Sequence, residues 1–343
     1  MYLSLVIPAY NSQRTIIPLL ISIADSKRVK FDDLEIIVVD DKSKDKTIEA
    51  VQRFALRKGK TKISNLKLIS LKRNVGPAEA RNIGVKYAKG EVILFLDADV
   101  LVYRDTLYEV IRSFRTDADL HALTGVWDKS QKSNKFFPKF KALRDWSYWI
   151  NERDPKNYYY LFSTRVAAIN RELFIRLGGF DTTYKAALVE DIELTYRIAR
   201  RYAVVFNPKV IVRHEFEDFI PIAKKYFWRS FYWSKIYRER KKFDPVATTS
   251  KEAVTTISAG LLVIVTLTYL IGLVVSSKYN TLLLTTLYSL LFIHLWGVRK
   301  FLWFCAKEEG IWFAVKAFFT GIILYLTILA GAAASFFSNG KST

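Results

Sequence analysis

Short apolar runs alternate with amphipathic stretches through the first hundred residues of the chain. Four runs, at residues 3–7, 35–39, 66–70 and 92–96, are rich in β-branched residues. A helical pattern separates each run from the next, which is typical of strand–helix–strand units. The pattern predicts an α/β fold, a Rossmann-like sheet that is largely parallel at its start.

Polar residues follow each of the four predicted strands. They are Pro8-Ala9-Tyr10-Asn11, Asp40-Asp41, Lys72-Arg73-Asn74 and Asp97-Ala98-Asp99. Open α/β sheets bind ligands beyond the carboxyl ends of their strands. We therefore expect these groups to line one crevice.

The last third of the chain has the composition of a membrane domain. Residues 254–276 include no charged side chain, and a helix needs ~20 residues to span a bilayer. Two more apolar stretches follow, so we expect three transmembrane helices at about 254–276, 279–297 and 314–338. Buried helices of a soluble protein would be shorter and less crowded into one end.

Cations flank the predicted spans on one side. Arg238 and Arg240 precede the first span, and Arg299, Lys300 and Lys307 lie between the second and third. The chain opens directly on an apolar run without a basic leader. We therefore expect a multi-pass protein of the cell membrane with a cytoplasmic N-terminal domain and an external C-terminus.

The formal net charge of +20 is compatible with nucleic acid or with a membrane surface. Because the cations gather beside aromatic residues near the membrane entry, we expect anionic membrane lipids as the partner and no nucleic acid. The single cysteine, Cys305, excludes an internal disulfide and a cysteine-rich metal site.

Residues 218–250 combine many aromatic side chains with basic ones. This mixture favours a helix in the plane of the membrane interface, although its apolar faces also suit a buried helix. A loop rich in lysine and aromatic residues is expected at 135–149. The predicted domains are thus 1–217, catalytic; 218–250, an interfacial helix and linker; and 251–343, transmembrane.

Asp97 and Asp99 follow a buried strand and stand two residues apart, so they can meet on one ion only if the chain turns there. Two carboxylates at such a turn suit Mg²⁺ or Mn²⁺, which also binds diphosphate oxygens and neutralises a leaving nucleoside diphosphate. His214, after another strand-like run, is a candidate third ligand or a surface histidine. The alternative for the acids is a solvated turn before a helix.

Two further acidic pairs could contact a ligand. Asp40 and Asp41 could accept hydrogen bonds from a nucleobase or a ribose, although Asp41 also suits a plain turn. Glu190 and Asp191 open a predicted helix, where the helix dipole favours acids for structural reasons alone. A glycine-rich turn at residues 178–181 would bring this helix back to the sheet, where a carboxylate could act as a general base.

Taken together, these motifs resemble glycosyltransferase family 2, the inverting enzymes with a GT-A fold. The matching segments are residues 6–11, 38–43, 74–84, 90–99, 178–181 and 190–191, in an order that covers about the first 215 residues. The membrane helices suggest the branch that acts on polyprenyl-linked glycans, in a minimal version of the cellulose synthase architecture.

The resemblance implies a role for individual residues. Asp191 would be the catalytic base, with Glu190 beside it, and Asp99 and His214 would hold the metal. Asp40 would bind the base of the nucleotide. The implied nucleotide-sugar site consists of Pro8, Ala9, Tyr10, Asn11, Asp40, Asn74, Arg81, Asp97 and Arg229.

At two motifs the sequence differs from related branches of the family, and these differences narrow the predicted reaction. Membrane-embedded members such as cellulose synthase carry a Gln-x-x-Arg-Trp motif, of which residues 226–230 keep only Arg229, a candidate for stabilising the leaving diphosphate. Residues 100–104 lack the Leu-Gln-His-Pro-Pro-Glu continuation of dolichol-phosphate mannose synthases. Both processive glucan synthesis and loading of a bare polyprenyl phosphate are less favoured.

The sequence therefore predicts transfer of a mannose- or glucose-type hexose from a GDP- or UDP-linked donor to a polyprenyl- or dolichol-linked acceptor. The alternatives are a polysaccharide synthase, a polyprenyl-phosphate sugar synthase, and an inactive membrane scaffold that keeps the fold. Retention of both Asp99 and Asp191 argues against the scaffold.

Overall fold

The computed structural model describes residues 1–56, 62–153, 160–183, 189–241, 249–275 and 278–337. The chain divides into two compact units. The sheet unit comprises Met1–Ser133 and Arg153–Phe216, and the helical unit comprises Asn134–Glu152 and the chain from Glu217 onward.

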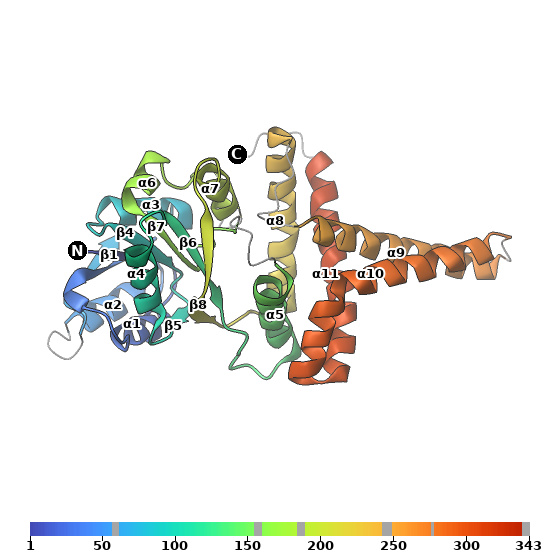
Figure 1. The fold of residues 1–343 in the computed structure, drawn as a ribbon, viewed down its shortest axis with the longest axis horizontal. Helices are drawn as coiled ribbons and strands as arrows, with labels where there is room; N and C mark the ends of the chain where they lie inside the picture. Colours follow the sequence, from blue (N-terminus) through green and yellow to red (C-terminus); the bar gives the residue numbers. More distant parts are fainter. Residues whose placement is uncertain (57–61, 154–159, 184–188, 242–248, 276–277, 338–343) are drawn as a thin grey trace. The chain divides into compact units, whose positions relative to one another are not determined.

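Within the described residues, the sheet unit has an eight-stranded sheet with the order β3-β2-β1-β4-β7-β6-β8-β5. Figure 1 shows this sheet with helices packed around it. The bounds of the strands are β1 (Leu3–Ala9), β2 (Leu34–Asp40), β3 (Leu66–Ser70), β4 (Val92–Leu96), β5 (Val100–Val102), β6 (Ala122–Trp127), β7 (Val166–Asn170) and β8 (Val204–His214). The first four strands run parallel, whereas β7 is antiparallel to β4 and β6, and β5 is antiparallel to β8. The predicted mixed α/β fold of GT-A type is confirmed.

Helices of the sheet unit are α1 (Ile16–Ala24), a 3₁₀ turn η1 (Phe31–Asp33), α2 (Thr47–Ala55), α3 (Pro77–Lys86), α4 (Thr106–Thr116), α6 (Arg171–Arg176) and α7 (Glu190–Ile198). Helix α3 packs tightly on the sheet because Gly84 has no side chain. A Cβ there would lie 2.5 Å from Cγ1 of Val6 in β1. This close approach sets the distance between α3 and the sheet, and so the position of the site residues on α3.

The core beside β4 consists of aromatic rings. Phe95 is fully buried and lies 6.1 Å from Phe162, 5.3 Å from Phe174 and 5.2 Å from Phe180, measured between ring centroids. Burying such a ring contributes ~1.5–3 kcal/mol to folding. Because Phe180 follows Gly178 and Gly179, this packing also anchors the glycine turn.

The helical unit includes α5 (Phe136–Trp146), a π-helical turn η2 (Ser147–Glu152), α8 (Phe219–Arg240), α9 (Ser250–Val274), α10 (Asn280–Glu309) and α11 (Ile311–Phe337). Helices α9, α10 and α11 are long and apolar enough to cross a membrane. The mean hydropathies of their most apolar 18-residue stretches are 2.4, 1.6 and 2.0. The three apolar helices were predicted; the end positions 276 and 338 lie outside the described residues.

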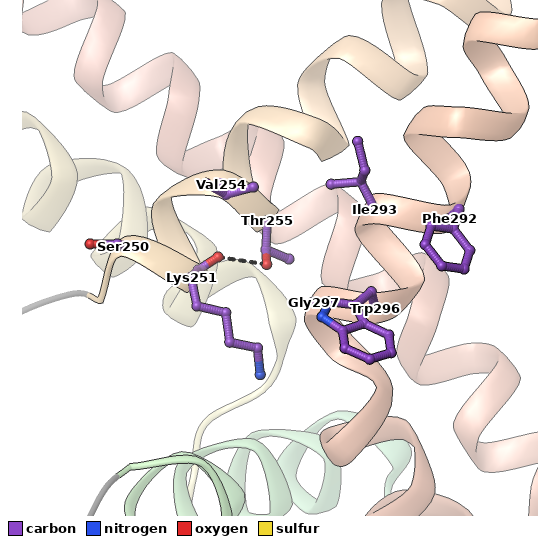
Figure 2. A pocket seen from close by; sticks show the side chains of 8 residues that line it. All are labelled: Ser250, Lys251, Val254, Thr255, Phe292, Ile293, Trp296 and Gly297. Carbon is purple, nitrogen blue, oxygen red and sulfur yellow. Dashed lines mark hydrogen bonds between the residues drawn. The ribbon is translucent and has the colours of Figure 1, made fainter.

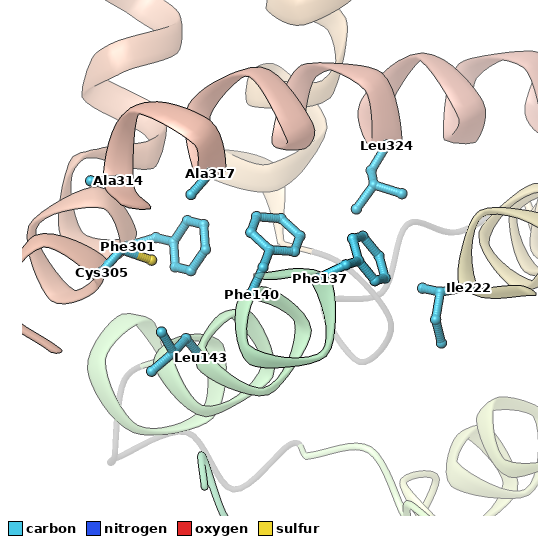
Figure 3. Packing of buried hydrophobic residues seen from close by; sticks show 9 residues of the cluster. All are labelled: Phe137, Phe140, Leu143, Ile222, Phe301, Cys305, Ala314, Ala317 and Leu324. Carbon is cyan, nitrogen blue, oxygen red and sulfur yellow. The ribbon is translucent and has the colours of Figure 1, made fainter. Parts of the chain in front are cut away.

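The predicted loop at 135–149 is wrong, because this segment is helical. One face of α5 carries Phe137, Phe140 and Leu143, which are buried against residues of the other helices (Figure 3). The remaining members of this cluster are Ile222, Phe301, Cys305, Ala314, Ala317 and Leu324. The aromatic residues of this segment therefore belong to a packing face of α5.

Helix α8 runs beside α11 (Figure 1). A Cβ on Gly331 would lie 2.2 Å from the carbonyl oxygen of Phe227, and Ser230 Oγ donates to the carbonyl of Ile328 at 2.7 Å. Ile220 and Trp228 of the same helix are exposed. One face of α8 is thus packed in the unit; its depth in a membrane stays a prediction.

Candidate active site

The loops that follow β1 and β2 are joined by hydrogen bonds. The backbone N–H of Asn11 donates to Ser43 Oγ at 2.9 Å, and the N–H of Lys44 donates to Asn11 Oδ1 at 2.8 Å. Asn11 adopts a left-handed conformation with φ of 51°, which asparagine tolerates better than most residues. Asn11, predicted to contact the nucleotide, thus also fixes the loop after β2.

The two acids at the end of β2 have different surroundings. Asp41 accepts hydrogen bonds from the backbone N–H groups of Val75 at 2.7 Å and Gly76 at 2.9 Å, so it anchors the start of α3. Asp40 is fully buried, and its Oδ2 accepts from the N–H of Ser43 at 3.1 Å. Its Oδ1 has no hydrogen-bond partner within the described residues. A buried acceptor without a donor is costly, and a ligand N–H would satisfy it.

Arg81 connects three elements that are far apart in the sequence. Its guanidinium lies 2.7 Å from Asp97, at the end of β4, and 3.1 Å from Glu190, at the start of α7. The Arg81 side chain is only 3% exposed. Burial opposes its charge, but the neighbouring carboxylates of Asp97 and Glu190 raise the pKa of Arg81.

The glycine turn before α7 is held against α3 by Asn82. The Asn82 side chain donates to the carbonyl of Phe180 and accepts from its N–H, both at 2.9 Å. Gly178 and Gly179 have φ of 82° and 74°, a region that favours glycine. The predicted return of this turn to the sheet is confirmed. Asn82 was not among the predicted site residues, although it lies next to Arg81 in the matching segment 74–84.

Glu190 is a buried acid in an unusual protonation environment. Burial and the charge of Asp191 raise the pKa of Glu190 to about 7, although Arg81 opposes the shift. Its Oε2 has no hydrogen-bond partner in the part of the chain that the structure describes. Asp191 is half-buried beside it, and its Oδ1 accepts from the N–H of Ile192 at 2.8 Å.

This shift predicts a pH-dependent stability. Folded Glu190 keeps its proton up to about pH 7, whereas the ordinary value is 4.5. The protonated Glu190 therefore adds to the free energy of unfolding in full below pH 4.5, and this contribution is lost as the pH rises through 7. The loss amounts to about 3 kcal/mol at most. The Tm of the purified chain in detergent should therefore fall over this range relative to the Glu190→Gln variant. Parallel pH profiles of the two proteins would contradict the assignment.

The chain turns sharply between Asp97 and Asp99, because β4 ends at Leu96 and β5 begins at Val100. The two acids then have different partners. Asp97 contacts Arg81, whereas Oδ2 of Asp99 lies 3.3 Å from Nε2 of His214. The contact follows from strand register, since Val100 pairs directly with His214.

Asp99 and His214 form the group best suited to a cation. The Asp99 side chain is 53% exposed, so the desolvation that opposes its charge is limited, and the hydrogen bond and charge of His214, with the charge of Arg165, lower its pKa. His214 Nδ1 is buried without a hydrogen-bond partner among the described atoms. No cluster of three or more His, Cys, Asp or Glu side chains occurs in the described segments. The pair fits an ion that takes its other ligands from water and a bound diphosphate.

The other predicted residues take supporting or separate positions. At the end of β1, Pro8 is half-buried, Ala9 is buried and Tyr10 is exposed. Asn74 donates to the carbonyl of Asp41 at 3.0 Å, so its amide supports the loop. Arg229 belongs to α8 of the helical unit, and its Nε is buried with no hydrogen-bond partner in the described chain. Its contact with a diphosphate stays a prediction.

Known proteins share this sequence pattern. The family model described as glycosyl transferase family 2 matches residues 4–183, which is 180 of the 343 residues. The poly(ribitol-phosphate) β-N-acetylglucosaminyltransferase TarS of Staphylococcus aureus is 35% identical over 130 residues. The poly-β-1,6-N-acetyl-D-glucosamine synthase of Staphylococcus epidermidis is 31% identical over 123 residues.

These matches are partial. They cover 37% and 36% of this chain but only 22% and 28% of the two relatives, so the chain spans roughly a quarter of their length. A solved structure matches along nearly the whole chain. The mannosyltransferase PcManGT of Pyrobaculum calidifontis, in complex with GDP-Man and Mn²⁺, superposes with a TM-score of 0.61 at 20% identity, over 98% of this chain and 88% of that one.

The likeness to the Pyrobaculum enzyme shows the fold alone, because so few residues are identical. The family model, in contrast, includes the residues of the site on β1, β2, α3 and β4, and it extends through the glycine turn. This chain belongs to glycosyltransferase family 2.

Proposed function

We propose that this family 2 enzyme transfers a hexose, with inversion and with the help of a divalent metal, from a nucleotide-diphosphate sugar to a polyprenyl- or dolichol-linked acceptor. The observation that supports this most is the buried Arg81, which holds Glu190 beside Asp97 at the carboxyl end of the sheet. Asp191, the residue after Glu190, is the candidate base. This arrangement brings it to the edge of the sheet where such folds bind nucleotides.

The donor would lie across the ends of β1, β2 and β4. Asp40 offers a buried oxygen that a nucleobase N–H could satisfy. Asp97 faces the ribose and diphosphate in this arrangement, with its charge partly balanced by Arg81. Both contacts use side chains already fixed by the loops, so binding requires little reorganisation.

Asp191 is the proposed general base. It takes the proton from the acceptor hydroxyl while that oxygen attacks the anomeric carbon, and the bond from this carbon to the diphosphate breaks. Attack from the face opposite the leaving group inverts the configuration. Glu190 is too deeply buried to share this role, and its contact with Arg81 makes it a positioning residue.

Asp99 and His214 would hold Mg²⁺ or Mn²⁺. When bound, the ion neutralises charge that develops on the leaving nucleoside diphosphate. A site with one carboxylate and one imidazole from the protein leaves room for diphosphate oxygens. PcManGT, which has a similar fold, binds Mn²⁺ and GDP-Man.

The apolar helices α9 to α11 support a membrane location for the reaction, on the cytoplasmic face by the placement of cations described above. A lipid-linked acceptor would be held at the same surface. A polysaccharide synthase is the second candidate, favoured by the similarity to the poly-β-1,6-N-acetyl-D-glucosamine synthase.

A donor screen tests the proposal. Membranes containing the chain are incubated with labelled GDP-mannose, UDP-glucose and UDP-N-acetylglucosamine, with either Mn²⁺ or a chelator, and then extracted with organic solvent. Metal-dependent label in the organic phase is the expected result. Label in an insoluble polymer would favour the synthase, and no transfer from any donor would favour the inactive scaffold.

The metal assignment predicts the effect of Asp99→Ala. This variant should lose the increase in nucleoside diphosphate affinity that Mn²⁺ gives, about tenfold or more, as in other sites that lose a group holding the metal. Isothermal titration with and without Mn²⁺ measures it. Asp105→Ala is the matched control, since Asp105 is an exposed acid whose ion pair, among the described residues, is with Arg28. Equal Mn²⁺ dependence in all three proteins would refute the assignment.

A further inference from the structure

An open groove lies between α9 and α10 in the helical unit (Figure 2). It has a volume of about 420 Å³, and its lining residues are Ser250, Lys251, Val254, Thr255, Phe292, Ile293, Trp296 and Gly297. The two helices are antiparallel, because Thr255 meets Gly297 while Gly272, further along α9, accepts a hydrogen bond from Asn280 at the start of α10.

The groove exists because no side chain fills its floor. A Cβ on Gly297 would lie 2.2 Å from Thr255 Oγ1, so the helices touch there. The Thr255 hydroxyl donates to the carbonyl of Lys251 at 2.8 Å, so this polar group of the floor has its hydrogen bond within α9. The walls are Val254, Phe292 and Trp296, all exposed. An apolar trough on a helix suited to a membrane matches a hydrocarbon chain.

Cations gather at one end of this groove. Lys251, with its side chain 39% exposed, lines it directly. The guanidinium of Arg299 lies 3.6 Å from the ring centroid of Trp296, which forms a wall. Lys300, the next residue, donates to the backbone carbonyl of Asn151 at 3.2 Å and thus faces the same end.

Two carboxylates are also near, but they are already paired. Glu152 lies 3.6 Å from Lys251 and 3.0 Å from Arg144, and Glu252 lies 2.8 Å from the same arginine. Among the described residues at this end, the four cations Lys251, Arg144, Arg299 and Lys300 therefore face the two acids Glu152 and Glu252, which leaves an excess of two positive charges. This end of the groove favours an anion.

The position of the cations also fits the surface of a bilayer. Arginine, lysine and tryptophan concentrate where membrane helices leave the hydrocarbon layer. Lys251 stands in the first turn of α9, and Arg299 follows the predicted end of the second span. A phosphate at this level would have its chains directed along the groove toward Phe292.

From this geometry we propose that the groove is a binding site for one anionic phospholipid, with its phosphate at Lys251 and Arg299 and an acyl chain between Val254 and Phe292. The proposal does not require sugar transfer, so it can succeed or fail apart from the proposed function. A boundary lipid without preference and a second copy of the chain are the alternatives that the experiment distinguishes.

Quenching of Trp296 by brominated lipids tests the site. The full chain is reconstituted in phosphatidylcholine nanodiscs containing equal fractions of either dibromo-phosphatidylglycerol or dibromo-phosphatidylcholine. Subtracting the signal of the Trp296→Phe variant isolates Trp296 from the other tryptophans. We expect the anionic lipid to associate more strongly, and Lys251→Gln to reduce this preference about fivefold, since one cation at a membrane surface is worth ~1 kcal/mol.

Two control variants make the result specific. Lys316→Gln removes the same charge from an exposed position on α11 and should keep the full preference. Lys251→Arg retains the charge and should keep it too, which separates loss of binding from loss of folding. Equal quenching by both lipids, or an unchanged preference in Lys251→Gln, would refute the site. Absence of quenching by either lipid would mean that protein, such as a second copy, covers the groove.

Discussion

Asp191→Asn should abolish sugar transfer while leaving nucleotide binding unchanged. The amide cannot take the proton from the acceptor hydroxyl, and loss of a general base lowers the rate by about a thousandfold. The substitution changes no volume, and the N–H of Ile192 still finds an oxygen on the side chain. The measurement is kcat with the donor identified in the screen, alongside Kd for the nucleoside diphosphate.

A neighbouring acid gives the matched control. Glu193 also stands in the first turn of α7, but it pairs with Arg197 at 2.8 Å on the same helix. Glu193→Gln should therefore retain most of its turnover. If Asp191→Asn retained its turnover as well, another group would be the base.

Arg81→Met should destabilise the sheet unit more than other single changes in the site. It removes the positive charge between Glu190 and Asp97 and leaves the first of these acids buried without a partner. Breaking a buried ion pair costs about 3–5 kcal/mol. In a unit of this size this corresponds to a drop in Tm of roughly 10 °C.

The effect should be largest where Glu190 is ionised, above its pKa of about 7. Adding Glu190→Gln to the Arg81→Met variant should restore part of the lost stability, because the buried acid is then neutral. Thermal unfolding of both proteins measures this coupling. The control is Arg28→Met, whose partner Asp105 lies at 2.9 Å but whose pair is more than half exposed, so solvent screening makes the expected loss of stability small. Equal losses in the two single variants would contradict a buried role for Arg81.

The sequence alone was enough to locate the strands that carry the site. β1, β2 and β4 are mostly apolar and buried, so their existence could be predicted. The predicted end of β4 at Leu96 is correct, whereas β1 and β2 continue to Ala9 and Asp40, beyond the predicted ends at residues 7 and 39. The start of α7 at Glu190 was recognisable for the same kind of reason, since acids are favoured in a first helical turn. These features depend on local sequence.

Features that depend on distant partners could not be predicted. Asp97 and Asp99 looked like one pair in the sequence, but the partner of the first comes from α3 and that of the second from β8. The antiparallel insertion of β7 between β4 and β6 likewise depends on tertiary packing. Helix α5 was predicted as a loop because its aromatic stripe has no meaning without α10 and α11.

The course of the chain through α5 limits how the protein can be divided. The polypeptide leaves the sheet unit after Ser133, returns at Arg153 and leaves again after Phe216. A soluble fragment made by stopping near residue 217 would thus keep Phe137, Phe140 and Leu143 while losing every helix that shields them from water. Exposed aromatic surface of this kind promotes aggregation. Separating the sheet unit from the apolar helices would require redesign of residues 134–152 in addition to removal of α8 to α11.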